Sequence, residues 1–171
     1  LVLREGLLEL GTAGALRASG GAGLLFEGGT LRFGAGAIED VSASIGFIAA
    51  GQTAKIDSNG QSVNFSAGLN GDGGLLKLGE GKLMLSGSST LGAGVTIEGG
   101  TIGLGASGIF SGDSQITVNG GLLDLGETSQ RTGVITLQSG EMRGGTIDVS
   151  RMVLAVGTIN SSLSGSGTVT K

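Results

Sequence analysis

The chain has 171 residues, of which 38 are glycine, and it contains no proline, cysteine, histidine, tryptophan or tyrosine. Its net charge of −4 and its scattered Lys and Arg residues argue against nucleic-acid binding, which requires a basic surface. Hydrophobic residues make up 39% of the chain, too many for a disordered glycine-rich linker, and no apolar run reaches the roughly 18 residues of a membrane helix.

Pairs of short apolar segments recur along the chain. Residues 24–34 (LLFEGGTLRFG) and residues 95–105 (VTIEGGTIGLG) both consist of two alternating apolar segments joined by a glycine turn. Each copy predicts two short β-strands, which we call strand A and strand B. The copies recur about every 22 residues, a period typical of the rungs of a β-solenoid. Strand A is expected to begin at positions 1, 24, 54, 76, 95, 116, 135 and 154.

Alternation within each strand predicts which side chains point inward, because successive residues of a strand face opposite sides. The inward pairs of the B strands are Leu8/Leu10, Leu31/Phe33, Val63/Phe65, Leu83/Leu85, Ile102/Leu104, Leu123/Leu125 and Ile147/Val149. Those of the A strands are Leu1/Leu3, Leu24/Phe26, Leu76/Leu78, Val95/Ile97, Ile116/Val118, Ile135/Leu137 and Leu154/Val156. Residues expected to face solvent are Glu9, Arg32, Asn64, Lys77, Thr96, Asp124 and Asp148. Stacking predicts one buried column formed by Leu31, Val63, Leu83, Ile102, Leu123 and Ile147.

The periodicity favours a solenoid over a β-sandwich. A sandwich is built from hairpins, and Asn59-Gly60 and Asn119-Gly120 would suit hairpin turns. Hairpins have no reason to repeat their side-chain types at a fixed period, whereas each rung of a solenoid buries its apolar face only against its neighbours. Residues 35–53 make the longest interval and hold enough apolar residues for an extra strand. We therefore predict an all-β fold in which residues 1–171 form a single parallel solenoid of about eight rungs.

Residues 71–102 (GDGGLLKLGEGKLMLSGSSTLGAGVTIEGGTI) carry the clearest repeat. Their spacing of Gly, Leu and Lys, ending in Leu-Ser-Gly, resembles the autotransporter-associated β-strand repeat, also called the passenger-associated transport repeat. Residues 88–92 depart from the Asn-x-Tyr-Thr-Gly that is usual in that family. The resemblance implies a right-handed parallel β-helix in the secreted passenger region of an autotransporter, extracellular or on the surface of a Gram-negative bacterium. Residues 163–171 resemble the start of a further copy, so we expect an excerpt of a longer passenger.

No residues typical of an active site are evident. Without His a Ser-His-Asp arrangement is impossible, and without Tyr or Trp the chain lacks the usual aromatic platforms for sugars. Asp124 and Asp148 are expected at equivalent positions of successive rungs, where two carboxylates could couple, but a solvated acidic surface is the interpretation we favour. The isolated Gly-Asp sequences at 71–74 and 112–113 lack the tandem nonapeptides of Ca²⁺-binding β-rolls. We thus expect no catalytic, cofactor-binding or metal-binding residues.

Three functions remain open at this point. The leading hypothesis is structural, a stalk or fibre segment of an autotransporter-like surface protein. An adhesin whose outward face or 35–53 segment contacts a cell-surface or glycan ligand is the first alternative, and a carbohydrate-active β-helix enzyme is the second. Neither end carries a polar cap, so we expect each end to pack against further rungs of the same protein or against another copy in a fibre.

Overall fold

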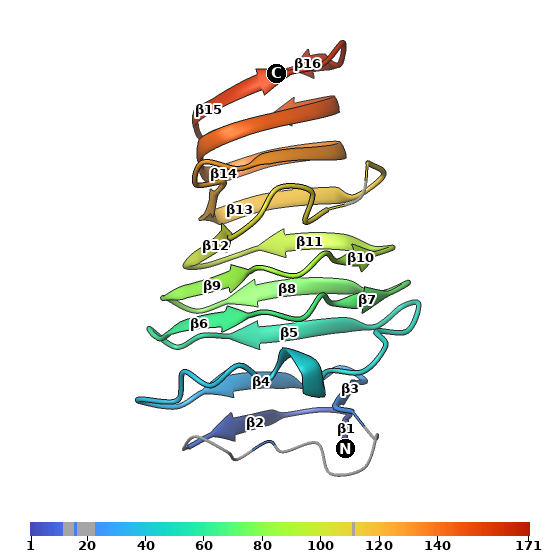
Figure 1. The fold of residues 1–171 in the computed structure, drawn as a ribbon, viewed down its shortest axis with the longest axis vertical. Coiled ribbons are helices and arrows are strands. Elements are labelled where there is room, and N and C mark those ends of the chain that lie inside the picture. Colours follow the sequence, from blue (N-terminus) through green and yellow to red (C-terminus); the bar gives the residue numbers. More distant parts are fainter. Residues whose placement is uncertain (12–15, 17–22, 111) are drawn as a thin grey trace.

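The computed structural model describes residues 1–11, 16, 23–110 and 112–171. Parallel β-strands are stacked along one axis from the N-terminus to the C-terminus, in about eight turns of a β-solenoid (Figure 1). Within the described residues, the one helix is the 3₁₀ turn η1 (Ser42–Ser44). The predicted all-β solenoid is therefore confirmed, whereas the right-handed sense of the coil stays a prediction.

The strands are mostly two to five residues long near the N-terminus and become longer towards the C-terminus. They are β1 (Val2–Leu3), β2 (Leu7–Leu10), β3 (Leu25–Phe26), β4 (Thr30–Phe33), β5 (Thr53–Asp57), β6 (Ser62–Phe65), β7 (Asn70–Gly71), β8 (Gly74–Leu78), β9 (Lys82–Leu85), β10 (Thr90–Leu91), β11 (Gly94–Ile97), β12 (Thr101–Leu104), β13 (Gln115–Asp124), β14 (Ser129–Leu154), β15 (Thr158–Ser164) and β16 (Thr168–Thr170).

Strand pairing divides the coil into three faces. Face 1 consists of β1, β3, residues 45–48, β7 and β10, which are linked by parallel pairs and two isolated bridges. Face 2 runs through β2, β4, β5, β8, β11, the first part of β13 and residues 134–137 of β14. Face 3 begins at β6 and continues through β9, β12, the second part of β13, residues 141–143 of β14 and the start of β15.

The interior is filled by aliphatic and Phe side chains, since the rungs can bury apolar surface only against one another. Most of the predicted inward positions are buried, and the six residues of the predicted column are all at most 1% exposed. Removing such a side chain from water stabilises the fold by about 1.5–3 kcal/mol. Alternation along each strand therefore identified most of the core.

The predicted column, however, is split between faces. Leu31 in β4 lies opposite Ile56 in β5. The predicted B strand at β4 therefore lies on face 2, the same face as the predicted A strands of the later rungs. The reason is the segment 34–44, which takes the place of a face-3 strand in the second rung. Val63, Leu83, Ile102 and Leu123 do stack on face 3, but the next residue there is Met142. Ile147 instead lies opposite Leu163, beyond the corner at Gly144 and Gly145.

Strand β8 is shifted by one residue from its predicted phase. Leu75 and Lys77 point inward, whereas Leu76 and Leu78 are half-buried, so both the predicted pair and the predicted exposure of Lys77 are wrong. Pairing explains the shift, because Ile56, Lys77 and Ile97 lie directly opposite one another in β5, β8 and β11. A one-residue change of register moves every side chain of a strand to the other side.

Two further predicted inward positions lie near the ends of the stack. Leu1 is 60% exposed and Val156 is 73% exposed, so neither belongs to the core. In the last rungs, the amide of Ala155 donates to the carbonyl of Leu137, which places Leu154 rather than Val156 over that residue. The fully buried side chain nearby is Met152, which the alternation did not identify.

Candidate functional site

The predicted acidic pair is not assembled. Asp124 lies opposite Arg143 in the pairing of β13 with β14, whereas Asp148 lies opposite Ser164 in the pairing of β14 with β15. Asp148 forms an ion pair with Arg131, with Nε and Oδ2 3.7 Å apart. Their predicted equivalence is wrong because residue 148 has already passed the corner that ends face 3.

Asp124 instead accepts hydrogen bonds and ion pairs from three directions. Arg143 approaches its Oδ2 at 3.1 Å, the Lys82 ammonium approaches the same oxygen at 3.5 Å, and the amide of Gly126 donates to Oδ1 at 3.1 Å. Partial burial alone would raise the pKa of Asp124, but these donors and charges outweigh it and hold the pKa below its usual value. The carboxylate is thus a stable anion that links rungs, with no free proton to exchange near neutral pH.

Gly103 makes the long contact between Lys82 and Asp124 sterically feasible. Lys82 is in β9 and Asp124 is in β13, so the Lys82 side chain must cross β12, which lies between them. A Cβ atom on Gly103 would collide with Cε of Lys82 and would lie 2.9 Å from its Nζ. The missing side chain of Gly103 is therefore what allows a lysine to span two rungs.

Lys77 is the most unusual charged residue of the interior. Its side chain is fully buried, and its Nζ donates to the carbonyls of Leu78 at 2.6 Å, Gly79 at 2.8 Å and Gly99 at 3.3 Å. All three ammonium donors therefore have acceptors. Burial lowers the pKa of Lys77 to about 8, although the negative charges of Asp57 and Glu80 oppose this change. The residue is sealed from solvent, so the arrangement stabilises turns and offers no accessible amine.

Asp40 organises the segment that interrupts face 3. Its Oδ1 accepts hydrogen bonds from the amide of Ser42 at 2.9 Å and from its hydroxyl at 2.6 Å. Its Oδ2 accepts from the amide of Ser66 at 2.9 Å and from the Ser66 hydroxyl, while Ser42 Oγ accepts from the amide of Ala67. Burial opposes ionisation of Asp40, but these hydrogen bonds outweigh it and lower the pKa. Side chains thus supply the acceptors that a regular strand would provide.

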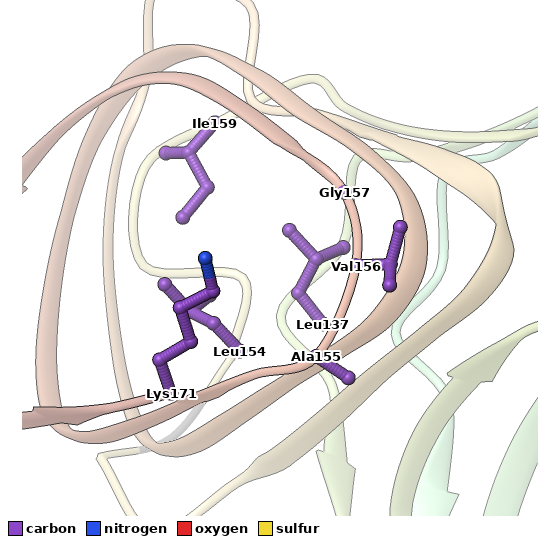
Figure 2. A pocket seen from close by; sticks show the side chains of 7 residues that line it. All are labelled: Leu137, Leu154, Ala155, Val156, Gly157, Ile159 and Lys171. Atoms are coloured by element: carbon purple, nitrogen blue, oxygen red, sulfur yellow. The ribbon is translucent and has the colours of Figure 1, made fainter.

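An apolar cavity of about 370 Å³ lies among the last rungs. Figure 2 shows Leu137, Leu154 and Ile159 pointing into the space enclosed by the coil, with Lys171 beside them. The cavity has a mainly apolar lining, to which Lys171 adds an ammonium group, and lies at the C-terminal end of the described stack. Its shape and chemistry suit packing rather than catalysis.

A second hollow is a shallow polar groove of about 440 Å³ on the outside of the corner between faces 2 and 3. Glu80, Thr101, Glu141 and Thr158 flank a floor made of the glycines of successive turns. A Cβ atom on Gly100 would collide with carbonyls of the neighbouring rung, and one on Gly140 would do the same. Close rung packing therefore accounts for the glycines, and the groove is their consequence.

In residues 1–11, 16, 23–110 and 112–171, no three His, Cys, Asp or Glu side chains come close enough together to hold a metal ion. Over the same residues, no helix has the length and hydrophobicity to span a membrane.

Of these polar features, Asp40 had a weak signal in the sequence and Lys77 had none. Asp40 stands two residues before Ser42, the spacing of an Asx turn, in which a side-chain oxygen accepts a hydrogen bond from the amide two residues further on. Lys77 lies between two Leu residues, and only the pairing with neighbouring rungs decides which of the three points inward.

Comparisons with known proteins give one informative similarity. No family model matches the chain, and no solved structure matches it. The chain is 31% identical over 157 residues to the adhesin BmaC autotransporter of Brucella suis biovar 1 (strain 1330). The match covers 88% of this chain but only 4% of that protein, so the chain spans a small fraction of its relative's length. The solenoid fold and this similarity fit the passenger region of an autotransporter.

Proposed function

We propose that this chain is a rigid rod segment in the passenger of an autotransporter-like surface protein, extracellular or displayed on a Gram-negative bacterium. The observation that carries the proposal is the continuous parallel pairing of face 2 from β2 to β14. Each rung adds about 4.8 Å, so about eight rungs form a rod roughly 40 Å long. The similarity to an autotransporter supports the same placement. As part of this proposal, we assign residues 71–102 to the autotransporter-associated β-strand repeat.

Adhesion is the second candidate function. The segment 35–53 departs from the regular ladders, and its Ile38 and Phe47 are each 61% exposed. Large apolar side chains on a segment that is held in place by Asp40 are suited to contact another surface. The relative is itself named an adhesin, although the match covers only a small part of it.

An enzymatic role has less support. Asp124 and Asp148 each pair with a cation, and their positions lie apart on different faces of the coil. We therefore retain the expectation that the chain is not a carbohydrate-active enzyme and carries no cofactor. For the apolar cavity of Figure 2, the proposed partner is another β-rung, from the same protein or from a second copy.

The rod and the adhesin can be separated by exchanging the segment in the complete protein on its own bacterium. If this segment is a rod, replacing it with an equal number of rungs from an unrelated β-solenoid preserves adherence and antibody access to the remainder. If this segment makes the contact, adherence falls after the exchange. It also falls in the double variant Ile38→Ser/Phe47→Ser, although surface display is unchanged. If the exchanged protein is no longer displayed, the result contradicts the rod. If the double variant also adheres as well as wild type, the result contradicts the adhesin.

A further inference from the structure

An apolar row faces solvent on the first rungs of face 1. Val2 in β1 lies opposite Leu25 in β3, and these side chains are 42% and 40% exposed. The next residue of this outward row is Gly46, because Leu24 is bridged to Ile45. A Cβ atom on Gly46 would lie 2.8 Å from Cδ2 of Leu25. The Leu25 side chain therefore extends over the third rung, into the space that a side chain at position 46 would occupy.

Phe47 extends this row at an irregularity in the strand. Leu24 is bridged to Ile45 and Ile48 is bridged to Gly71, so residues 45–48 remain in the stack. Strict alternation from Ile45 would turn Phe47 inward, yet it is 61% exposed. Among the described residues, the other four Phe side chains are at most 5% exposed. Irregular strand positions often re-aim a side chain towards a function, and leaving a Phe in water forgoes about 1.5–3 kcal/mol.

One positive and one negative side chain stand beside the apolar row. Arg4 and Glu27 are the outward residues that follow Val2 and Leu25 by two positions, and they form an ion pair in which Nε and Oε2 are 3.1 Å apart. Their side chains are 79% and 43% exposed, so both can reach a second molecule. A surface with an apolar centre and both charges at its rim is complementary to itself under a two-fold rotation.

We propose that Val2, Leu25 and Phe47, the face-1 patch, form a contact through which two copies of this chain associate side by side. In the two-fold arrangement, Arg4 of each copy faces Glu27 of the other, Val2 faces Leu25, and Phe47 extends the apolar contact on the third rung. The patch is small, so the contact is weak and becomes effective where many copies are displayed close together. The inference concerns lateral pairing and does not depend on the proposed role as a rod.

Engineered cysteines give the first test, because the chain has no Cys of its own. Leu25→Cys places a thiol at the centre of the patch, and Ile38→Cys places one at an equally accessible apolar site outside it. A short bifunctional thiol reagent is expected to cross-link the Leu25→Cys protein into dimers and to leave the Ile38→Cys protein at least tenfold less cross-linked. Equal cross-linking of the two, or none in either, overturns the proposal.

Charge exchange gives a second test that does not alter the apolar residues. Arg4→Glu gives a copy with two acids at the rim, and Glu27→Arg gives a copy with two bases. Each variant alone is expected to dimerise at least tenfold more weakly than wild type in sedimentation velocity, whereas an equimolar mixture recovers heterodimers. If neither charge variant nor Phe47→Ser weakens the association, the copies associate through another surface, for example by end-to-end stacking. That result contradicts the face-1 contact.

Discussion

The Lys77 ammonium donates a hydrogen bond to the carbonyl of Gly99, 22 residues further along the chain, at 3.3 Å. The bond joins consecutive rungs from inside the coil, where a charge is otherwise expensive. Burial lowers the pKa of Lys77 to about 8, against 10.5 in an unfolded chain. Between these values the unfolded state binds more protons than the folded state, so stability rises with pH in that window.

We expect the free energy of unfolding to increase by about 1–3 kcal/mol between pH 8 and pH 10.5 as Lys77 releases its proton in the folded state. The chain has no Tyr or Cys to titrate in the same range. Urea unfolding followed by circular dichroism at several pH values measures the effect. The Lys77→Met variant, which has no ionisable group at this position, is expected to lack the increase. A wild-type curve that is flat or falls above pH 8 would contradict the burial of this amine.

Leu123→Asp is expected to prevent folding or to cost more than about 4 kcal/mol, because it places an unpaired carboxylate in a column with no exposed surface. Leu123→Ala, which only leaves a cavity, should cost about 2–5 kcal/mol. Leu163→Asp provides the matched control, since Leu163 is 43% exposed and should tolerate the charge. Equal stability of the two Asp variants in urea unfolding would show that Leu123 faces water.

Gly103→Val is expected to uncouple Lys82 from Asp124, because the new side chain occupies the path of the lysine across β12. A double-mutant cycle with Lys82→Ala and Asp124→Asn should give a coupling energy of about 0.5–1 kcal/mol in the wild-type background. In the Gly103→Val background the coupling should disappear. Persistence of the coupling would mean that the lysine reaches Asp124 by another path.

Asp40→Asn should destabilise the protein by about 1–3 kcal/mol at pH 7, because four hydrogen bonds converge on the carboxylate. Because folding lowers the pKa of Asp40, its carboxylate stabilises the protein at pH values above the unfolded-state pKa. This stabilisation is lost as the pH falls through the folded-state pKa. Acid titration of unfolding free energy for the wild type and Asp40→Asn isolates this contribution. Asp72→Asn removes an exposed carboxylate and should leave stability unchanged at pH 7.

Calcium is expected to leave the thermal midpoint of unfolding unchanged, since the Gly-Asp turns of this chain are not arranged as tandem nonapeptides. Differential scanning fluorimetry with Ca²⁺ and with Mg²⁺ at equal ionic strength measures the effect. A rise in midpoint specific to Ca²⁺ would show a site in the complete chain that the sequence pattern does not reveal.

Alternation predicted the core wherever both neighbours of a strand follow the same frame, as they do for Leu83 and Ile102. It failed at Lys77, because the run of Leu residues around it fits either phase and only the opposing Ile56 and Ile97 decide between them. It also failed to separate Leu31 from the face-3 column. Nothing in the local pattern of β4 reveals that residues 34–44 replace a strand. The polar contacts of Asp40 and Asp124 depend on which residues lie one or two rungs away, information that a single repeat does not contain.

Residues 34–44 have a mechanical consequence for the solenoid. Above them, strands follow one another on faces 2 and 3, whereas the second rung is joined to the third by β4 and β5, by the single bridge between Leu24 and Ile45 on face 1, and on face 3 by contacts such as those of Asp40. We therefore expect the solenoid to be more compliant at this level than in the stack from β5 to β14. Under tension or shear it should yield here first, and amide protons of β1 to β4 should exchange with solvent sooner than those of the rungs that follow.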